Sequence, residues 1–213
     1  MIIETAAVGP FFKTGFVLGC ERTGEAVFVD PGDEVQALLD VAVQRGLTIG
    51  HIPLTHAHVD HVSGCAAARR ALGAPIYLHE ADNPIYRDAV RYGRVFGLTV
   101  EEPPPVDVFY TRDTVITFGD YTMRPHHTPG HCPGGVCLEV RKAGSDECHL
   151  FVGDTLFAGS IGRTDLPGGD YDVLMSSITG VLFSFGDGAI VYPGHGPNTT
   201  IGDERRTNPF LNR

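Results

Sequence analysis

Short apolar runs divided by turn residues fill the first third of the chain and predict alternating strands and helices. Residues 33–46 carry apolar side chains at helical spacing, with acids in the first turn and a glycine at the end, and predict a helix. Residues 47–58 predict a strand, followed by an alanine-rich helix over 62–73 and a short strand over 75–80. Before them, three apolar runs bounded by glycine or proline predict strands at residues 2–8, 14–20 and 26–32.

The pattern changes over residues 82–105. Residues 82–97 predict an amphipathic helix, whereas the three prolines within residues 98–109 rule out regular structure there. We expect residues 82–105 to form an insertion that serves as a lid or as a wall for substrate.

The second half of the chain returns to strands. A helix is predicted over residues 171–186, and residues 203–213 form a polar tail. No repeat or linker divides the sequence, so we expect one domain over residues 1–213, of α/β class, with two sheets pressed together and helices outside. The predicted strands of this half are residues 114–119, 121–130, 134–140, 149–157 and 189–196.

Composition narrows the possible partners. The 213 residues are 42% hydrophobic and 20% charged, as in ordinary globular proteins, and the formal net charge of −10 disfavours nucleic acids and anionic membranes. The N-terminus lacks a signal-peptide pattern and no apolar run approaches the roughly 20 residues that span a bilayer, so we expect a cytoplasmic protein with a small-molecule substrate. The five cysteines form no CxxC pair and are expected to be reduced; Cys132 is expected to be a small loop residue rather than a nucleophile.

Residues 54–64, LTHAHVDHVSG, crowd three histidines and an aspartate behind an apolar strand. Neutral imidazole and carboxylate are the ligands of zinc-like ions. His56, His58 and Asp60 are spaced two apart, which suits an extended segment rather than a helix. Asp60 and His61 are neighbours and point differently, so this segment can face two ions.

Three further candidate ligands follow or border other apolar strands, each flanked by glycine: His131, Asp154 and His195. Seven candidates exceed the roughly four to six positions that one small ion offers. Two ions that share a bridging carboxylate account for the number, and the ligand types suit zinc, iron and manganese.

The THAHVDH motif, with His131, Asp154 and His195 in their glycine-rich contexts, resembles the metallo-β-lactamase superfamily. Within it, residues 153–170 (GDTLFAGSIGRTDLPGGD) and 192–211 (YPGHGPNTTIGDERRTNPFL) are similar to short bacterial glyoxalase II-like (hydroxyacylglutathione hydrolase-like) hydrolases. The resemblance implies an αββα sandwich of two mixed β-sheets with outer helices and a site at one edge of both sheets.

Carried over by position, the resemblance implies a first ion held by His56, His58 and His131 and a second ion held by three other side chains, with Asp154 between the two ions. The second set is Asp60, His61 and His195. Two divalent ions would supply a bridging hydroxide as nucleophile, which makes Asp60 and Asp154 the catalytic candidates. The implied reaction cleaves a thioester such as S-lactoylglutathione to a hydroxy acid and a free thiol, as in methylglyoxal detoxification.

Substrate recognition departs from the longer family members. The C-terminal helical domain that binds glutathione there is expected to be missing here. Arg163 stands where those enzymes have a basic glutathione contact, but Asp165 replaces the aromatic residue expected two positions later. A surface ion pair with Asp165 or Asp170 is the alternative for Arg163.

Two other functions of the same fold remain open. A mononuclear iron persulfide dioxygenase would use His56, His131 and Asp154 as a facial triad. Lactone hydrolysis by an enzyme of the same fold is the second. Antibiotic hydrolysis is disfavoured because metallo-β-lactamases lack a bridging carboxylate at the position of Asp154 and are secreted.

Asp30 ends a predicted strand and is a candidate to orient a ligand histidine, with a turn-forming aspartate as the alternative. His126 or His127 could also support a ligand. The remaining histidines are expected to be structural or on the surface: His51, His79 and His149.

Overall fold

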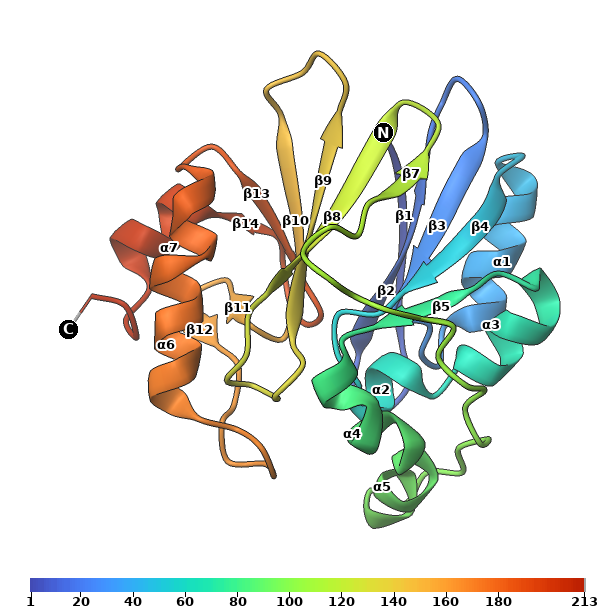
Figure 1. The fold of residues 1–213 in the computed structure, drawn as a ribbon, viewed down its shortest axis with the longest axis horizontal. Helices are drawn as coiled ribbons and strands as arrows, with labels where there is room; N and C mark the ends of the chain where they lie inside the picture. The colour runs from blue at the N-terminus through green and yellow to red at the C-terminus, as the bar shows by residue number, and fades with distance from the viewer. Residues whose placement is uncertain (213) are drawn as a thin grey trace.

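Two six-stranded sheets lie face to face in the computed structural model, which describes residues 1–212 (Figure 1). In the first sheet the strand order is β1-β2-β3-β4-β5-β6; β1, β2 and β3 are antiparallel neighbours, and β3 to β6 run parallel. A mixed sheet of this kind needs crossover helices between its parallel strands. The strands are β1 (Ile2–Val8), β2 (Lys13–Gly19), β3 (Glu25–Val29), β4 (Thr48–Pro53), β5 (Ile76–Leu78) and β6 (Val108–Phe109).

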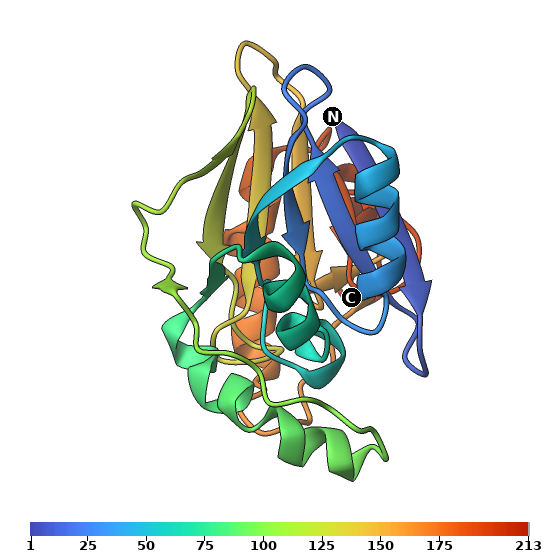
Figure 2. The same cartoon turned by 90° about the vertical axis from the view of Figure 1, so that its right-hand side faces the viewer.

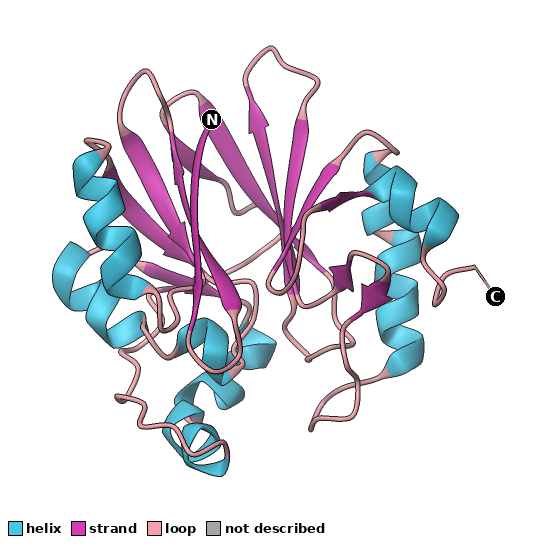
Figure 3. Cartoon of the chain, turned by 180° about the vertical axis from the view of Figure 1, so that it is seen from behind, coloured by secondary structure: helices cyan, strands magenta, loops and turns pink. Residues whose placement is uncertain are grey.

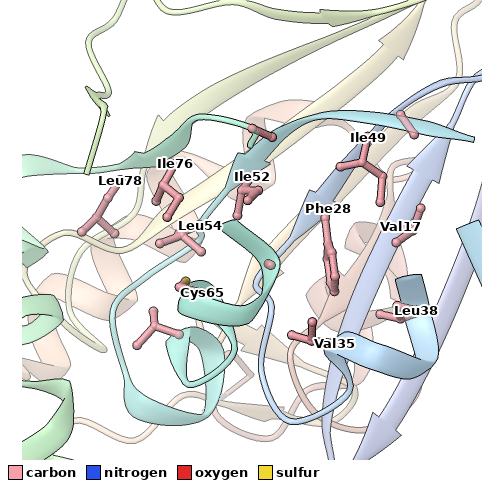
Figure 4. Packing of buried hydrophobic residues seen from close by; sticks show 14 of the residues in the cluster. Val17, Phe28, Val35, Leu38, Ile49, Ile52, Leu54, Cys65, Ile76 and Leu78 are labelled. Atoms are coloured by element: carbon pink, nitrogen blue, oxygen red, sulfur yellow. The ribbon is translucent and has the colours of Figure 1, made fainter. Parts of the chain in front are cut away.

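In the sequence, α1 (Val35–Gln44) lies between β3 and β4, and α2 (Val59–Val62) and α3 (Cys65–Leu72) lie between β4 and β5. Figure 4 shows Val35 and Leu38 of α1 and Cys65 of α3 facing Phe28 and Ile52 of the sheet. All five side chains are buried, so this face of the first sheet is covered by an apolar helical layer.

The second sheet has the order β14-β13-β10-β9-β8-β7 and is also mixed, because β10 and β13 are parallel whereas the other neighbours are antiparallel. Leu174 and Ile178 of α6 (Tyr171–Gly180) and Ile201 of α7 (Ile201–Thr207) pack on its outer face, with the 3₁₀ turn η2 (Leu182–Phe185). The strands are β7 (Ile116–Phe118), β8 (Tyr121–His127), β9 (Val136–Lys142), β10 (Cys148–Gly153), β13 (Ile190–Pro193) and β14 (Thr199–Thr200).

The inner faces of the two sheets share a third apolar core. Phe16 and Val29 of the first sheet meet Met123, Leu138 and Phe151 of the second, and the Phe16 and Phe151 rings pack edge to face with centroids 5.1 Å apart. Helices therefore cover the outside of both sheets, as Figure 3 shows from behind. The predicted αββα sandwich of two mixed sheets is confirmed.

Three sequence predictions of local structure hold only in part. Residues 82–97 form two short helices, α4 (Asn83–Arg87) and α5 (Ala89–Val95), because the chain leaves helical geometry at Asp88 (φ −99°, ψ 8°). The first five residues of the predicted polar tail, 203–207, belong to α7, which begins at Ile201 and whose N-terminus is capped by Thr200. Residues 98–109 are irregular except that β6 pairs with β5.

Two further elements complete the chain. The 3₁₀ turn η1 (Glu80–Asp82) precedes α4, and β11 (Leu156–Phe157) pairs with β12 (Ser160–Ile161) as a separate hairpin. In Figure 2, α4 and α5 lie at one end of the molecule, beyond the sheets. No helix among the described residues combines the length and the hydrophobicity needed to cross a bilayer.

Candidate metal centre

The predicted ligands lie at one edge of the sandwich and come from both sheets. His56 and His58 follow β4, and Asp60 and His61 belong to the short helix α2. The others come from the second sheet and follow the strands β8, β10 and β13: His131, Asp154 and His195. Since β8, β10 and β13 point the same way, their carboxyl ends bring these residues to the same edge.

The structure brings all seven candidates together in three overlapping groups, and in each group the ligand atoms lie within 4.8 Å of one another. The first and third groups match the two sets implied by the family resemblance. Within them, Nδ1 of His58 is 2.8 Å from Nε2 of His131, and Nε2 of His195 is 3.1 Å from Oδ2 of Asp60. The groups are His56, His58 and His131; His56, His61 and Asp154; and Asp60, His61 and His195.

Asp154 stands between the two sets. Its Oδ1 is 3.3 Å from Nε2 of His61, while its Oδ2 is 3.8 Å from Nε2 of His131 and 3.5 Å from Nε2 of His195. One carboxylate therefore faces members of both sets, which is the position that a bridging ligand requires.

Hydrogen bonds behind the rings fix how two of the histidines face the site. His131 Nδ1 donates to the backbone oxygen of Arg163 (2.8 Å), and His195 Nδ1 donates to that of Phe11 (3.2 Å). Because a carbonyl oxygen only accepts, Nδ1 carries the proton in both rings. Each Nε2 then keeps a lone pair toward the site, as a metal ligand needs.

Asp30 has the same effect on His61, as the sequence suggested. Its Oδ2 accepts from Nδ1 of His61 (2.9 Å), and its carboxylate also accepts from the backbone nitrogen and the hydroxyl of Thr55, both at 2.6 Å. Thr55 Oγ1 lies 3.1 Å from Nδ1 of His56. The Asp30 backbone has φ +51°, a left-handed conformation that non-glycine residues rarely adopt.

A buried ion pair behind Asp30 was missed in the sequence. Lys13 donates to the backbone oxygen of Asp30 and to Oε1 of Glu34 at 2.7 Å, and the two charged side chains are only 2% and 1% exposed. Glu34 Oε1 also accepts from the backbone nitrogen of Gly32 (2.8 Å). A lysine at the start of strand β2, which has no other charged residue, was the available signal.

Three buried nitrogen and oxygen atoms of the site have no hydrogen-bond partner, and a bound cation would supply one. Nε2 of His56, Nε2 of His61 and Oδ1 of Asp154 are buried without a hydrogen-bond partner. An unsatisfied buried polar atom costs about 1–3 kcal/mol. All three atoms lie in the candidate groups, and a divalent ion is the kind of partner that imidazole nitrogen and carboxylate oxygen share.

The electrostatics of the site agree with that fit. Burial, with His131 nearby, lowers the pKa of His58 to about 4, which keeps this imidazole in its neutral, ligating form. Burial also opposes charge on His61, but the carboxylates of Asp60 and Asp154 outweigh it and raise its pKa to about 10. Without a metal ion these carboxylates hold a proton on His61, and a cation that binds there would replace that proton as the positive charge between them.

A missed carboxylate, Asp82, ties two ligand loops together. It accepts from the backbone nitrogens of Ala57 (3.0 Å), between His56 and His58, and of Gly134 (2.5 Å), in the loop that carries His131. Cys132 Sγ is 3.2 Å from Oδ2 of Asp82 and buried, and burial raises its thiol pKa well above the ordinary range. A buried, protonated thiol is a poor nucleophile, which supports the prediction for Cys132.

Arg163 lies beside the site, and its side chain forms an ion pair with Asp165 (2.7 Å) and is 56% exposed. The alternative anticipated for this residue is therefore what the structure shows, although its backbone oxygen supports His131. His127 Nε2 donates to the backbone oxygen of Pro133 (2.9 Å), a contact with the loop that carries His131.

The remaining histidines lie outside the candidate groups. His51 and His149 each contact a tyrosine hydroxyl, at 2.9 and 3.0 Å, and His126 pairs with Glu139 at 2.7 Å. His79 stacks on His127 with ring centroids 4.1 Å apart.

A pocket of about 180 Å³ opens over the candidate ligands. Its floor is formed by His58, Asp60, His131, Asp154 and His195. Its walls are largely apolar and are completed by one arginine; they are formed by Phe11, Val59, Ile85, Tyr92, Phe96, Leu166, Pro167 and Arg163.

Comparison with known proteins agrees with the geometry. The hydroxyacylglutathione hydrolase GloC of Haemophilus influenzae is 35% identical over 215 residues, covering 100% of this chain and 99% of that protein. The crystal structure of the B3 metallo-β-lactamase BLEG-1 has a TM-score of 0.89 and 37% identity, with 100% of both chains covered. The structure of TTHA1623 in a di-iron-bound form has a TM-score of 0.85 and 39% identity, covering 98% of this chain and 100% of that one.

The model of the metallo-β-lactamase superfamily matches residues 8–195, a range that includes all seven candidate ligands. The sequence resemblance is thereby confirmed at the level of the family. From the fold, the clustered ligands and this match, the chain belongs to the metallo-β-lactamase superfamily of metallo-hydrolases.

Proposed function

We propose that the chain is a binuclear metal-dependent hydrolase that cleaves a thioester such as S-lactoylglutathione to a hydroxy acid and a free thiol. The observation that carries the two-ion proposal is the position of Asp154, whose two oxygens face histidines of different sets. The thioester proposal is supported by end-to-end similarity to GloC. A role in methylglyoxal detoxification, a cytoplasmic location and a single domain over residues 1–213 belong to the same proposal.

Each candidate ligand is assigned to one of the two ions or to both. His56, His58 and His131 would hold one ion and Asp60, His61 and His195 the other, with Asp154 shared. Zinc, iron and manganese all suit these ligands. Two such ions, when bound, lower the pKa of water and polarise a carbonyl group.

The carboxylates of Asp60 and Asp154 remain ionised, because burial is outweighed by neighbouring imidazoles that lower the pKa of both. They can accept hydrogen bonds from the attacking water and orient it. In the overall reaction the water oxygen bonds to the carbonyl carbon and gives up a proton, the C–S bond breaks, and the thiolate leaves with the electron pair and takes up a proton from solvent. A thiol of pKa about 8.5 leaves readily, so no separate general acid is required.

The test combines elemental analysis of the purified chain with a thioester assay using S-lactoylglutathione. About two metal ions per chain and metal-dependent thiol release support the proposal. One iron per chain, with oxygen consumption on a persulfide and no hydrolysis, would establish the dioxygenase instead. A lactone panel tests the remaining hydrolase of this fold.

Hydrolysis of a β-lactam amide is a second candidate, because BLEG-1 covers the whole chain at 37% identity. A chromogenic cephalosporin in the same assay decides between the two. Faster turnover of the cephalosporin than of every thioester would replace the thioester proposal.

A further inference from the structure

One wall of the pocket over the candidate metal centre is built from apolar side chains of distant segments. Phe11 comes from the loop between β1 and β2, Ile85 from α4, Tyr92 from α5, and Leu166 from the segment after β12. Phe96 follows α5 directly, and its ring meets Phe11 edge to face, with centroids 5.5 Å apart at 89°. The residues after β1 and the predicted insertion thus join into one apolar surface beside the site.

The size of the pocket limits what can be enclosed. Its volume of about 180 Å³ compares with the roughly 150 Å³ of an apolar cavity that holds benzene. Pockets that enclose a whole drug-sized ligand are larger, about 300–1,000 Å³. The enclosed space therefore suits a benzene-sized or branched aliphatic group, and a tripeptide thiol must extend outside it.

The charges of the pocket lining also favour an apolar group over an anionic one. Among the described residues that line the pocket, Arg163 is the only lysine or arginine, and two hydrogen bonds of 2.7 and 2.8 Å join it to Asp165. Its charge is already compensated, so a substrate carboxylate gains little there. Binding to this lining instead gains free energy when apolar surface of the substrate is buried.

We propose that Phe11, Ile85, Tyr92, Phe96 and Leu166 form an acyl-group subsite, so that the preferred substrates are thioesters whose acyl group carries an aromatic or branched aliphatic substituent. The acyl substituent lies on this wall, the carbonyl group lies over the candidate ligands, and the thiol portion projects toward solvent. This inference rests on the proposed thioester hydrolysis and names its substrate class.

A matched pair of substrates tests it. S-mandeloylglutathione and S-lactoylglutathione share the thiol and the α-hydroxyacyl carbonyl, and differ by a phenyl group in place of a methyl group. After each rate is divided by that of hydroxide-catalysed hydrolysis, we expect kcat/KM to favour the mandeloyl thioester by at least about tenfold. Equal values, or a preference for the lactoyl thioester, would overturn the subsite.

Variants of the wall residues test whether the preference for the mandeloyl thioester depends on these side chains. Phe11→Ala and Phe96→Ala should each lower kcat/KM for the mandeloyl thioester several-fold more than for the lactoyl thioester, and so remove most of the mandeloyl preference. The matched controls are Phe12→Ala and Val95→Ala, which alter the adjacent side chains, 72% and 74% exposed and outside the pocket lining. A loss shared equally by both substrates in the wall variants would contradict a specific acyl subsite.

A binding measurement separates this inference from the proposed function. Titration calorimetry of the metal-loaded protein should show mandelate binding more tightly than lactate, with Phe11→Ala removing the difference. If neither thioester is hydrolysed and this difference persists, thioester hydrolysis fails and the subsite stands. If the two acids bind equally, the subsite fails whatever the hydrolysis assay shows.

Discussion

Replacing Lys13 by methionine tests whether the buried ion pair behind Asp30 stabilises the fold. The Lys13 and Glu34 side chains are 2% and 1% exposed, so the change leaves a carboxylate buried without its cation. Removing one partner of a buried pair costs about 3–5 kcal/mol. In a chain of this size each kcal/mol lowers Tm by roughly 2–4 °C, so Tm should fall by about 6–20 °C.

Urea unfolding and calorimetry of the metal-free protein measure the change. The double variant Lys13→Met/Glu34→Leu should recover most of the lost free energy, because it replaces both charges with apolar groups. Arg22→Met serves as the surface control: Arg22 is 69% exposed beside Asp120, and its loss should cost no more than about 1 kcal/mol. A cost below about 1 kcal/mol for Lys13→Met, or no recovery in the double variant, would refute the reasoning.

Four other outcomes are expected. Asp154→Ala should lower metal content in both sets and abolish hydrolysis, whereas two ions per chain by elemental analysis would remove this residue from the site. His195→Ala should mainly remove metal from the second ligand set and His131→Ala from the first, as competitive metal titration would show. Unchanged oxygen consumption by iron-loaded His195→Ala would favour the dioxygenase. Arg163→Ala should leave KM for S-lactoylglutathione within about twofold, because the ion pair with Asp165 already compensates the charge; a several-fold rise in KM with little change in kcat would show that Arg163 contacts the substrate. In the protein stripped of metal by a chelator, the folded pKa of His58 is about 4, below its unfolded value of about 6.5. The contribution of neutral His58 to the free energy of unfolding is therefore present above about pH 6.5 and is lost as the pH falls toward 4. Urea unfolding of the protein and of His58→Gln at several pH values measures this contribution.

Local pattern predicted the layers and the candidate ligands well, because both depend on short stretches of sequence. The two-residue spacing in residues 56–60, the adjacent His61 and the glycine-flanked strand ends were enough to select the seven side chains that the fold brings together. Helical periodicity over residues 82–97 was a weaker guide, since it did not reveal the break at Asp88. The short helix α7 was hidden in a polar segment whose cap, Thr200, has no hydrophobic pattern around it.

The supporting residues were harder to predict, because their partners are distant in the sequence. Asp82 holds Gly134 from 52 positions away, and Lys13 reaches Glu34 across 21. Neither pairing leaves a periodic signal. The apolar wall has the same character: Phe11 and Phe96 belong to different elements, and their contact depends on the completed fold.

Each candidate ligand set takes side chains from both sheets: His58 and His131 are 73 positions apart, and Asp60 and His195 are 135 apart. Ions held there would act as cross-links that close long loops of chain. Their binding free energy would be added to that of unfolding, about 4 kcal/mol when free metal is a thousand times Kd. A chain deprived of metal would open and be degraded sooner, so metal supply would set how long each molecule persists as well as how fast it works.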